Sequence, residues 1–378
     1  LFFPKITGRA DWENGEIKLY CNQVFVSDSI KEIIPRYLLP LRGVIDSPDI
    51  PLNVSRSALQ SDRRVKSIGS FIAKKVADKL KSLYKEDKDS YAEVWDSISP
   101  FIKIGAMEDE KFADQIEKIM LYSTTYKENS NTDNDIQSEF MKANNKIYTT
   151  VENYLVRAND DKDKRILYCT DEISQQNALN LWTSQEVEVL LADSVIDAQF
   201  IPWLEERNSS IKFVRVDSEL DEELKENTSE IFDKDGENES ERLRNLIKKS
   251  IANENITIQI QSLKNENAPP SMILLPEQMR RINDITALMQ QKLPGLPQNH
   301  VLLINKKHPL VEGMLKMSSA KVLLQGDEES PTSKLSLEIG KHLYDMARLA
   351  VGGLEPNEIG EFQIKNSYLM GKLIQKAN

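Results

Sequence analysis

The alternation of strand and helix patterns between residues 165 and 216 constrains the fold of this chain more than any other feature. Short apolar runs at 165–169, 187–191 and 211–216 predict strands, and the stretches 174–183 and 197–204 between them predict helices. Strands that alternate with helices are typical of a parallel sheet covered on both faces. No glycine-rich loop follows either of the first two strands, so the pattern does not predict a dinucleotide-binding fold.

The chain before this block predicts a strand followed by helices. Residues 16–28 alternate apolar and polar side chains and predict one strand, and Asn14-Gly15 before it is a hairpin-turn signal. Residues 63–84 predict a long helix with one apolar face. Residues 90–121 predict further helix that is broken at Pro100, and the polar stretch 125–141 predicts a loop.

The chain after this block predicts a further mixed region that ends in helices. The acidic stretch 217–242 predicts a domain boundary, although a solvated helix face inside one domain explains it nearly as well. Residues 256–260 and 301–304 predict strands. The last 45 residues predict two helices that are separated by Gly352-Gly353 and Pro356.

The bulk composition narrows the class of protein. A length of 378 residues predicts two or three domains, and a net charge of -11 argues against nucleic acid as a main partner. Cys21 and Cys169 have no metal-site or disulfide spacing, which favours a reducing compartment. No apolar run is long enough to span a membrane, and no signal peptide is present. Because Leu1 begins inside an expected strand, residues 1–4, we expect a fragment that lacks its natural N-terminus.

The residue pattern contains no self-contained active site. His300, His308 and His342 have no metal-ligand spacing, and each is more often a surface or capping residue. No nucleophile-elbow sequence and no phosphate-cradling loop occurs. The residues alone therefore predict an acidic, soluble, multidomain α/β protein with a helical C-terminal end.

The decapeptide 51–60 is the most informative segment for function. Ser55 is a natural N-cap, and Arg56 and Gln60 fall four residues apart on one face of the helix that follows. A lone Arg at a helix start more often pairs with a nearby carboxylate. The neighbouring residues favour a functional role for Arg56 instead, because their similarity to a known protein family covers the whole run and not Arg56 alone.

The chain resembles the heat-shock protein 90 chaperone family over essentially its whole length. The segments that carry the resemblance to the family's middle domain are 1–5, 17–20, 34–37, 42–47, 52–56, 59–60, 166–168, 189–191 and 196–197. Those that resemble its C-terminal dimerisation domain are 305–311, 343–345, 349–350 and 352–353. The absence of a charged linker and of an acidic tail after Asn378 resembles the bacterial HtpG type.

The resemblance implies an α/β and α+β multidomain fold in four parts. Two αβα units of the middle domain precede a mixed C-terminal domain that ends in a helical dimerisation bundle. The implied parts are residues 1–88, the N-terminally truncated large α/β unit; 89–124, a helical connector; 125–228, the small α/β unit; and 229–378, the dimerisation domain.

The resemblance also implies an ATP-dependent molecular chaperone of the cytoplasmic stress response. ATP and Mg²⁺ would bind an N-terminal domain of the same protein that this chain lacks, so we expect no cofactor and no independent activity here. Arg56, with Gln60 beside it, would reach the γ-phosphate, where an Arg stabilises charge that develops during phosphoryl transfer. A non-enzymatic, dimeric interaction scaffold is the alternative, and an independent enzyme on the small α/β unit has little support.

Two segments are candidates for binding non-native client proteins. Within the segment 272–289, Pro276 fits the first turn of an amphipathic helix whose stripe comprises Met279, Ile282, Ile285 and Met289. An ordinary buried helix face explains this stripe better on the sequence alone, and the resemblance to a protruding client-binding segment favours exposure. The second candidate is Phe200 with Trp203, for which a core-packed helix end is the more common explanation.

The two terminal helices predict a homodimer. One face of the first carries Leu335, Ile339, Leu343, Met346 and Ala350, and one face of the second carries Ile359, Phe362, Leu369 and Leu373. A symmetric four-helix interface between two copies would bury both stripes. The alternative is that they fold back onto the strands predicted at 256–260 and 301–304.

Overall fold

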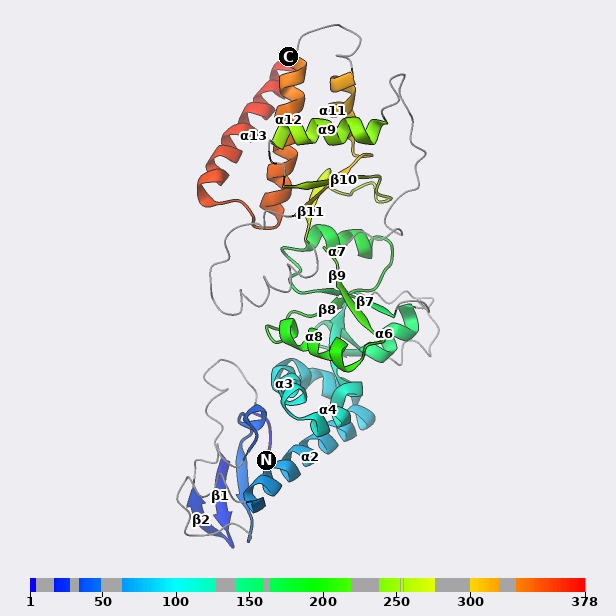
Figure 1. The fold of residues 1–378 in the computed structure, drawn as a ribbon. Helices are drawn as coiled ribbons and strands as arrows, with labels where there is room; N and C mark the ends of the chain where they lie inside the picture. Colours follow the sequence, from blue (N-terminus) through cyan, green and yellow to red (C-terminus); the bar gives the residue numbers. More distant parts are fainter. Residues whose placement is uncertain are drawn as a thin grey trace. The chain divides into compact units, whose positions relative to one another are not determined.

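The structure is a computed structural model (Figure 1). Its chain divides into two compact units. The first unit comprises residues 1–166 and 194–212, and the second comprises residues 167–193 and 213–378. No helix in the described part of the chain is long and apolar enough to cross a membrane. The described residues are 1–4, 17–27, 34–48, 63–126, 140–158, 164–218, 238–251, 253, 255–275, 300–319 and 331–377.

The first unit opens with a three-stranded sheet of order β2-β1-β3. Strand β1 (Ile17–Cys21) pairs antiparallel with β2 (Val24–Ser27) and parallel with β3 (Gly43–Asp46). The turn residues Asn22 and Gln23 have φ angles of 49° and 68°. Two left-handed residues match the twist of a hairpin. The prediction of one strand over 16–28 is therefore wrong, because the chain reverses at Asn22.

Residues 1–4 contribute one isolated antiparallel bridge, between Phe2 and Arg42, rather than a named strand. A short 3₁₀ helix follows at Arg36–Leu38. Its Tyr37 is buried, and the Tyr37 hydroxyl donates to the Asp109 carboxylate at 3.2 Å.

Three helices pack together in the first unit: α2 (Arg63–Glu86), α3 (Lys88–Glu108) and α4 (Glu110–Ile116). Helix α2 confirms the helix predicted at 63–84. The break predicted at Pro100 is wrong, because Pro100 lies inside α3. The chain breaks instead at Asp109, whose carboxylate accepts the Phe112 N–H at 3.1 Å and caps α4. An interior proline costs about 3 kcal/mol. Burial of α3 side chains on both sides of Pro100 offsets that cost.

The rest of the first unit contains strands that the sequence analysis missed. The antiparallel neighbours run in the order β5-β6-β4. The elements are a 3₁₀ turn at Glu117–Ile119, β4 (Leu121–Thr124), β5 (Met141–Ala143), β6 (Lys146–Thr150), α6 (Val151–Ala158) and α8 (Asp197–Arg207).

The boundary between the units crosses strands β7 (Arg165–Cys169) and β9 (Lys212–Arg215). In the second unit β7 pairs parallel with β8 (Leu190–Leu191), and β9 is the other neighbour of β7. Helix α7 (Gln176–Thr183) connects β7 to β8. These elements confirm the strand and helix alternation predicted between 165 and 216.

The remainder of the second unit has a sheet of order β10-β12-β11 and four helices in its described part. Strand β12 pairs parallel with β10 and antiparallel with β11. Both predicted strands and both terminal helices are confirmed. Strand β11, which contains Met272, was not predicted, and the helix expected to begin near Pro276 lies outside the described residues. The elements are α9 (Glu239–Ile251), β10 (Thr257–Gln261), β11 (Ser271–Leu274), β12 (Val301–Asn305), α11 (Pro309–Ser319), α12 (Pro331–Ala350) and α13 (Pro356–Ala377).

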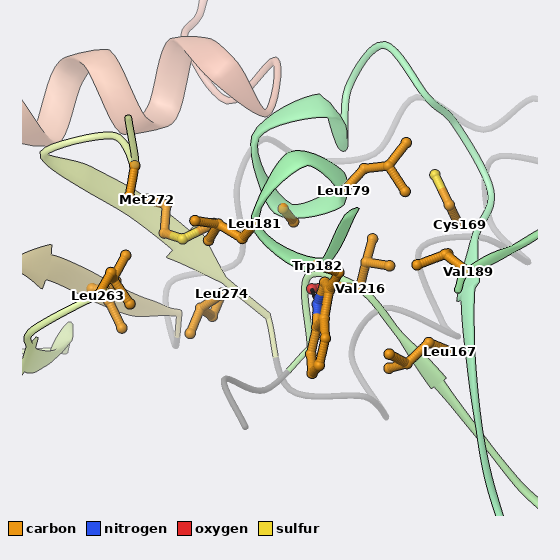
Figure 2. Packing of buried hydrophobic residues seen from close by; sticks show 13 residues of the cluster. Leu167, Cys169, Leu179, Leu181, Trp182, Val189, Val216, Leu263, Met272 and Leu274 are labelled. Atoms are coloured by element: carbon orange, nitrogen blue, oxygen red, sulfur yellow. Dashed lines mark hydrogen bonds between the residues drawn. The ribbon is translucent and has the colours of Figure 1, made fainter. Parts of the chain in front are cut away.

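Two apolar clusters form the core of the second unit. The Trp182 cluster joins α7 and its flanking strands to residues 263–274, and Figure 2 shows Trp182 between Leu274 and Val216. The Trp182 indole N–H donates to the Val216 carbonyl at 3.0 Å. The Leu343 cluster joins α9, α11 and α12 to the sheet. The mixed α/β class is thus confirmed, and the four-part domain division stays a prediction.

Candidate functional site

The structure describes only some of the predicted site residues. Phe200 and Trp203 lie on α8, and the predicted dimerisation residues lie on α12 and α13. Outside the described residues lie Arg56, Gln60, Met279, Ile282, Ile285 and Met289.

A buried ion pair anchors the start of α8. The Lys103 amine binds the Asp197 carboxylate, and the two side chains are 4% and 2% exposed. The second carboxylate oxygen of Asp197 accepts the Ser194 N–H at 3.2 Å. The Lys103 amine also lies 4.7 Å from the ring centre of Tyr122 and 5.8 Å from that of Phe200. These contacts join α3 to the first turn of α8.

The two α8 candidates differ in exposure. Phe200 is fully buried, so the core-packed explanation holds for its side chain. Trp203 is half-buried, and the Arg207 guanidinium lies 5.6 Å from its ring centre. Arg207 binds Glu117 at 2.7 Å and also pairs with Asp114. The hydrogen bond that Arg207 donates to the Glu117 carboxylate is the largest cause that raises the pKa of Arg207.

A polar cavity of about 570 Å³ opens beside Trp203. Three of its lining residues are carboxylates, and Arg207 is its one lining cation in the described part of the chain. It suits a polar or cationic group better than an apolar one. Its lining residues are Glu110, Glu117, Trp203, Glu206, Arg207 and Asn208.

An apolar groove of about 700 Å³ in the first unit was not predicted. Its walls come from residues 1–3, from 41–47 and from α2. Phe71 and Phe2 are each 60% exposed there. The apolar face predicted for α2 was the signal for this groove, but periodicity alone does not show that part of that face stays uncovered.

The terminal helices α12 and α13 form a hairpin, and the turn between them includes Gly352 with a φ angle of 67°. The Arg348 guanidinium binds both carboxylate oxygens of Glu358, at 2.9 and 2.7 Å. This hydrogen bonding is the main cause that lowers the pKa of Glu358. Lys365 of α13 lies 3.7 Å from the Asp345 carboxylate of α12.

The predicted dimerisation residues do not share one environment. Leu343 is fully buried in the Leu343 cluster with strands β10 and β12, so the fold-back alternative holds for it. Leu335, Ile339, Phe362 and Leu369 are half-buried. Met346, Ala350 and Ile359 are exposed, and Leu373 lies in α13 with its side chain outside the described residues.

Other apolar side chains of this hairpin are exposed and were not predicted. Ile364 is 73% exposed and Ile374 is 63% exposed. Leu349, Tyr368 and Met370 are also exposed. Leu349 lies in α12 and the others in α13, and all were missed because helical periodicity identifies an apolar face but not the side that its own domain covers.

Histidine, cysteine and carboxylate side chains of the described residues do not gather into a metal site. No group of three or more His, Cys, Asp or Glu residues among them could hold a metal ion. Burial raises the pKa of the Cys169 thiol to about 12, so this thiol is not an activated nucleophile.

Comparison with known proteins assigns the class. The family model described as "Hsp90 protein" matches residues 1–375, and the chain belongs to the Hsp90 family. Among its relatives, the "Chaperone protein HtpG" of Porphyromonas gingivalis is 34% identical over 83% of this chain and 45% of that protein. The proteins of the same name from Bacteroides fragilis and Bacteroides thetaiotaomicron are 33% and 32% identical. They align with 92% and 98% of this chain, and with 48% and 54% of their own lengths. The chain therefore spans about half the length of these relatives.

Proposed function

We propose that this chain is part of an ATP-dependent molecular chaperone that binds non-native proteins. The observation that carries the proposal is the similarity, over up to 98% of the chain, to relatives named chaperone protein HtpG. ATP and Mg²⁺ would bind in a part of the protein that precedes this chain. The two free, buried cysteines fit a reducing compartment such as the cytoplasm.

The proposed contribution of this chain to ATP hydrolysis is Arg56, with Gln60 beside it. A guanidinium brought to the γ-phosphate stabilises charge that develops in the transition state. In the full-length protein, Arg56→Ala should lower the hydrolysis rate by about tenfold or more and leave ATP affinity unchanged. Steady-state rates and calorimetric titration measure both. A variant with the parent's turnover would overturn this role.

The proposed client-binding surface is the stripe Met279, Ile282, Ile285 and Met289. An exposed apolar stripe should bind unfolded chains, so Ile282→Ser with Met289→Ser should weaken capture of an unfolded model protein and leave the melting temperature unchanged. A large loss of stability with unchanged capture would identify the stripe as core and contradict the proposal. Trp203 stays a second candidate, whereas Phe200 is no longer a candidate because its own side chain is buried.

The chain is further proposed to form a homodimer through α12 and α13. Exposed apolar residues on these helices support this, because such patches usually mark interfaces. A two-fold interface would bring the same helices of two copies together as a four-helix bundle. The exposed set that supports it is Met346, Leu349, Ile359, Ile364, Tyr368, Met370 and Ile374.

Light scattering tests the dimer. The chain should give twice its monomer mass of 43.2 kDa, and Ile364→Asp with Ile374→Asp should give monomers. Gln363→Asp with Ser367→Asp is the matched control, because it adds the same two charges at exposed polar positions of α13. A parent that is monomeric at tens of micromolar would overturn the dimer. Leu343 is a poor probe, because a charge there would disrupt the core of its own unit.

A further inference from the structure

His342 lies on α12 where that helix meets α13, which runs beside it in Figure 1. Its imidazole stacks on the Phe362 ring of α13, with ring centres 4.8 Å apart and planes only 9° apart. The Nδ1 atom is shielded from solvent and has no hydrogen-bond partner among the described residues. The stack is therefore a contact between two helices made by a titratable ring.

Burial, rather than the surrounding charges, disfavours a second proton on His342. Asp345 lies one turn along α12, but its carboxylate is already 3.7 Å from Lys365 and 3.9 Å from Arg348. Burial is the main cause that lowers the pKa of His342; Asp345 raises it and Lys365 lowers it. The cavity of about 210 Å³ along these helices is also lined by charged Lys341, Glu358 and Glu361, while α9 contributes the apolar Ile251.

Protonation would disturb this contact in two ways. An imidazolium carries N–H groups on both nitrogens, so Nδ1 would become a buried donor with no acceptor. It would also place a further cation near Lys365, whose charge already lowers the pKa of His342. A buried donor without an acceptor costs about 1–3 kcal/mol.

We infer that His342 is a pH-sensitive contact that holds α13 against α12 while its ring is neutral, releases α13 when protonated, and so regulates pairing of two copies of the chain. The inference rests on the proposed dimer through these helices. Exposed apolar residues of α13 would form the interface. Their placement depends on how α13 lies against α12.

The direction of the effect follows from proton linkage. The pKa of His342 is lower when α13 is docked than in a released helix, where it returns to about 6.5. The docked form therefore binds fewer protons, and docking weakens progressively as the pH falls below about 6.5. Each unit of pKa difference can weaken the dimer by at most about tenfold per protomer.

The experiment measures the dimer dissociation constant of the 378-residue chain at pH 7.5, 6.5 and 5.5, by light scattering over a dilution series at constant ionic strength. His342→Phe keeps an aromatic stack on Phe362 and cannot titrate. His308→Asn is the matched control, because it removes another of the three histidines and keeps an acceptor for the Leu310 N–H. Most carboxylates titrate near pH 4, below this range.

The dissociation constant should rise as the pH falls in the parent and in His308→Asn, and should stay constant in His342→Phe. Equal pH dependence in the parent and His342→Phe would overturn the inference. A parent that is monomeric at pH 7.5 would overturn the proposed dimer instead. In that case, amide hydrogen exchange of α13 should still accelerate at pH 5.5 relative to α9 after correction for intrinsic rates.

If His342→Phe fails to fold, an NMR titration of the parent decides, and a pKa of 6.5 or above for His342 would refute the inference.

Discussion

Lys103 carries its charge in the interior of the first unit, where it is 3% exposed. Burial of an ion costs several kcal/mol, and the Asp197 carboxylate offsets this by pairing with it. The nearby Tyr122 hydroxyl is shielded and has no hydrogen-bond partner among the described residues. Burial, followed by the charges of Asp197 and Glu117, raises the pKa of Tyr122 well above its ordinary value, so the phenol stays neutral.

The effect of the buried pair on the free energy of unfolding should become measurable only when one partner is removed. Lys103→Met leaves the Asp197 charge unpaired in the core and should lower the free energy of unfolding by about 3–5 kcal/mol. Adding Asp197→Asn removes that charge, keeps an acceptor for Ser194, and should restore much of the loss. Denaturant titration measures both variants.

The exposed pair between Lys146 and Asp96 is the control for this experiment. Its side chains are 40% and 42% exposed, and the charged atoms are 3.8 Å apart. Such pairs contribute about 0–1 kcal/mol. If Lys103→Met cost no more than Lys146→Met, the buried pair would not be what anchors α8.

At the scale of elements, Gly105 sets how closely α3 approaches the 3₁₀ helix at residues 36–38. A Cβ atom added at Gly105 would lie 2.5 Å from the Tyr37 ring. Gly105→Ala should therefore lower the free energy of unfolding, because overpacking of about 1–3 kcal/mol exceeds the gain in helix propensity of about 1 kcal/mol. Thermal and denaturant unfolding measure the change.

Gly313 in α11 is the matched control for Gly105, because nothing lies within 4 Å of an added Cβ there. Gly313→Ala should raise the free energy of unfolding by about 0.5–1 kcal/mol. The two substitutions are chemically identical, so opposite signs would isolate the contact with Tyr37. Equal signs would contradict the packing argument.

Element prediction from sequence succeeded where one physical signal dominated. The long apolar stripe was sufficient to predict helix α2, and short apolar runs were sufficient to predict strands β7, β10 and β12. It failed at Pro100, where tertiary burial outweighs the local penalty, and it missed the strand β11. The run 271–274 is buried along its whole length, and such a run does not distinguish a strand from a buried helix by period.

At the scale of the whole molecule, family membership could be predicted from short residue runs, but the burial or exposure of each site residue could not. Helical periodicity placed Leu343 and Met346 on one stripe, yet Leu343 is buried by its own sheet and Met346 is 38% exposed. The difference arises because residues far away in sequence, in β10 and β12, cover one side of α12 only. No local pattern contains that information.

The burial of both cysteines gives each unit its own chemical reporter. Cys21 lies in β1 of the first unit and Cys169 in the Trp182 cluster of the second, and they are 3% and 1% exposed. A disulfide-exchange reagent cannot reach either sulfur until the surrounding unit opens. Cys21→Ala and Cys169→Ala each leave a single thiol, whose labelling rate should therefore be far below that of free cysteine. This rate should report the opening of the unit that contains the remaining thiol, independently of the other unit. Labelling of a folded variant at the free-cysteine rate would refute this, whereas two different slow rates would rank the units by the free energy of opening.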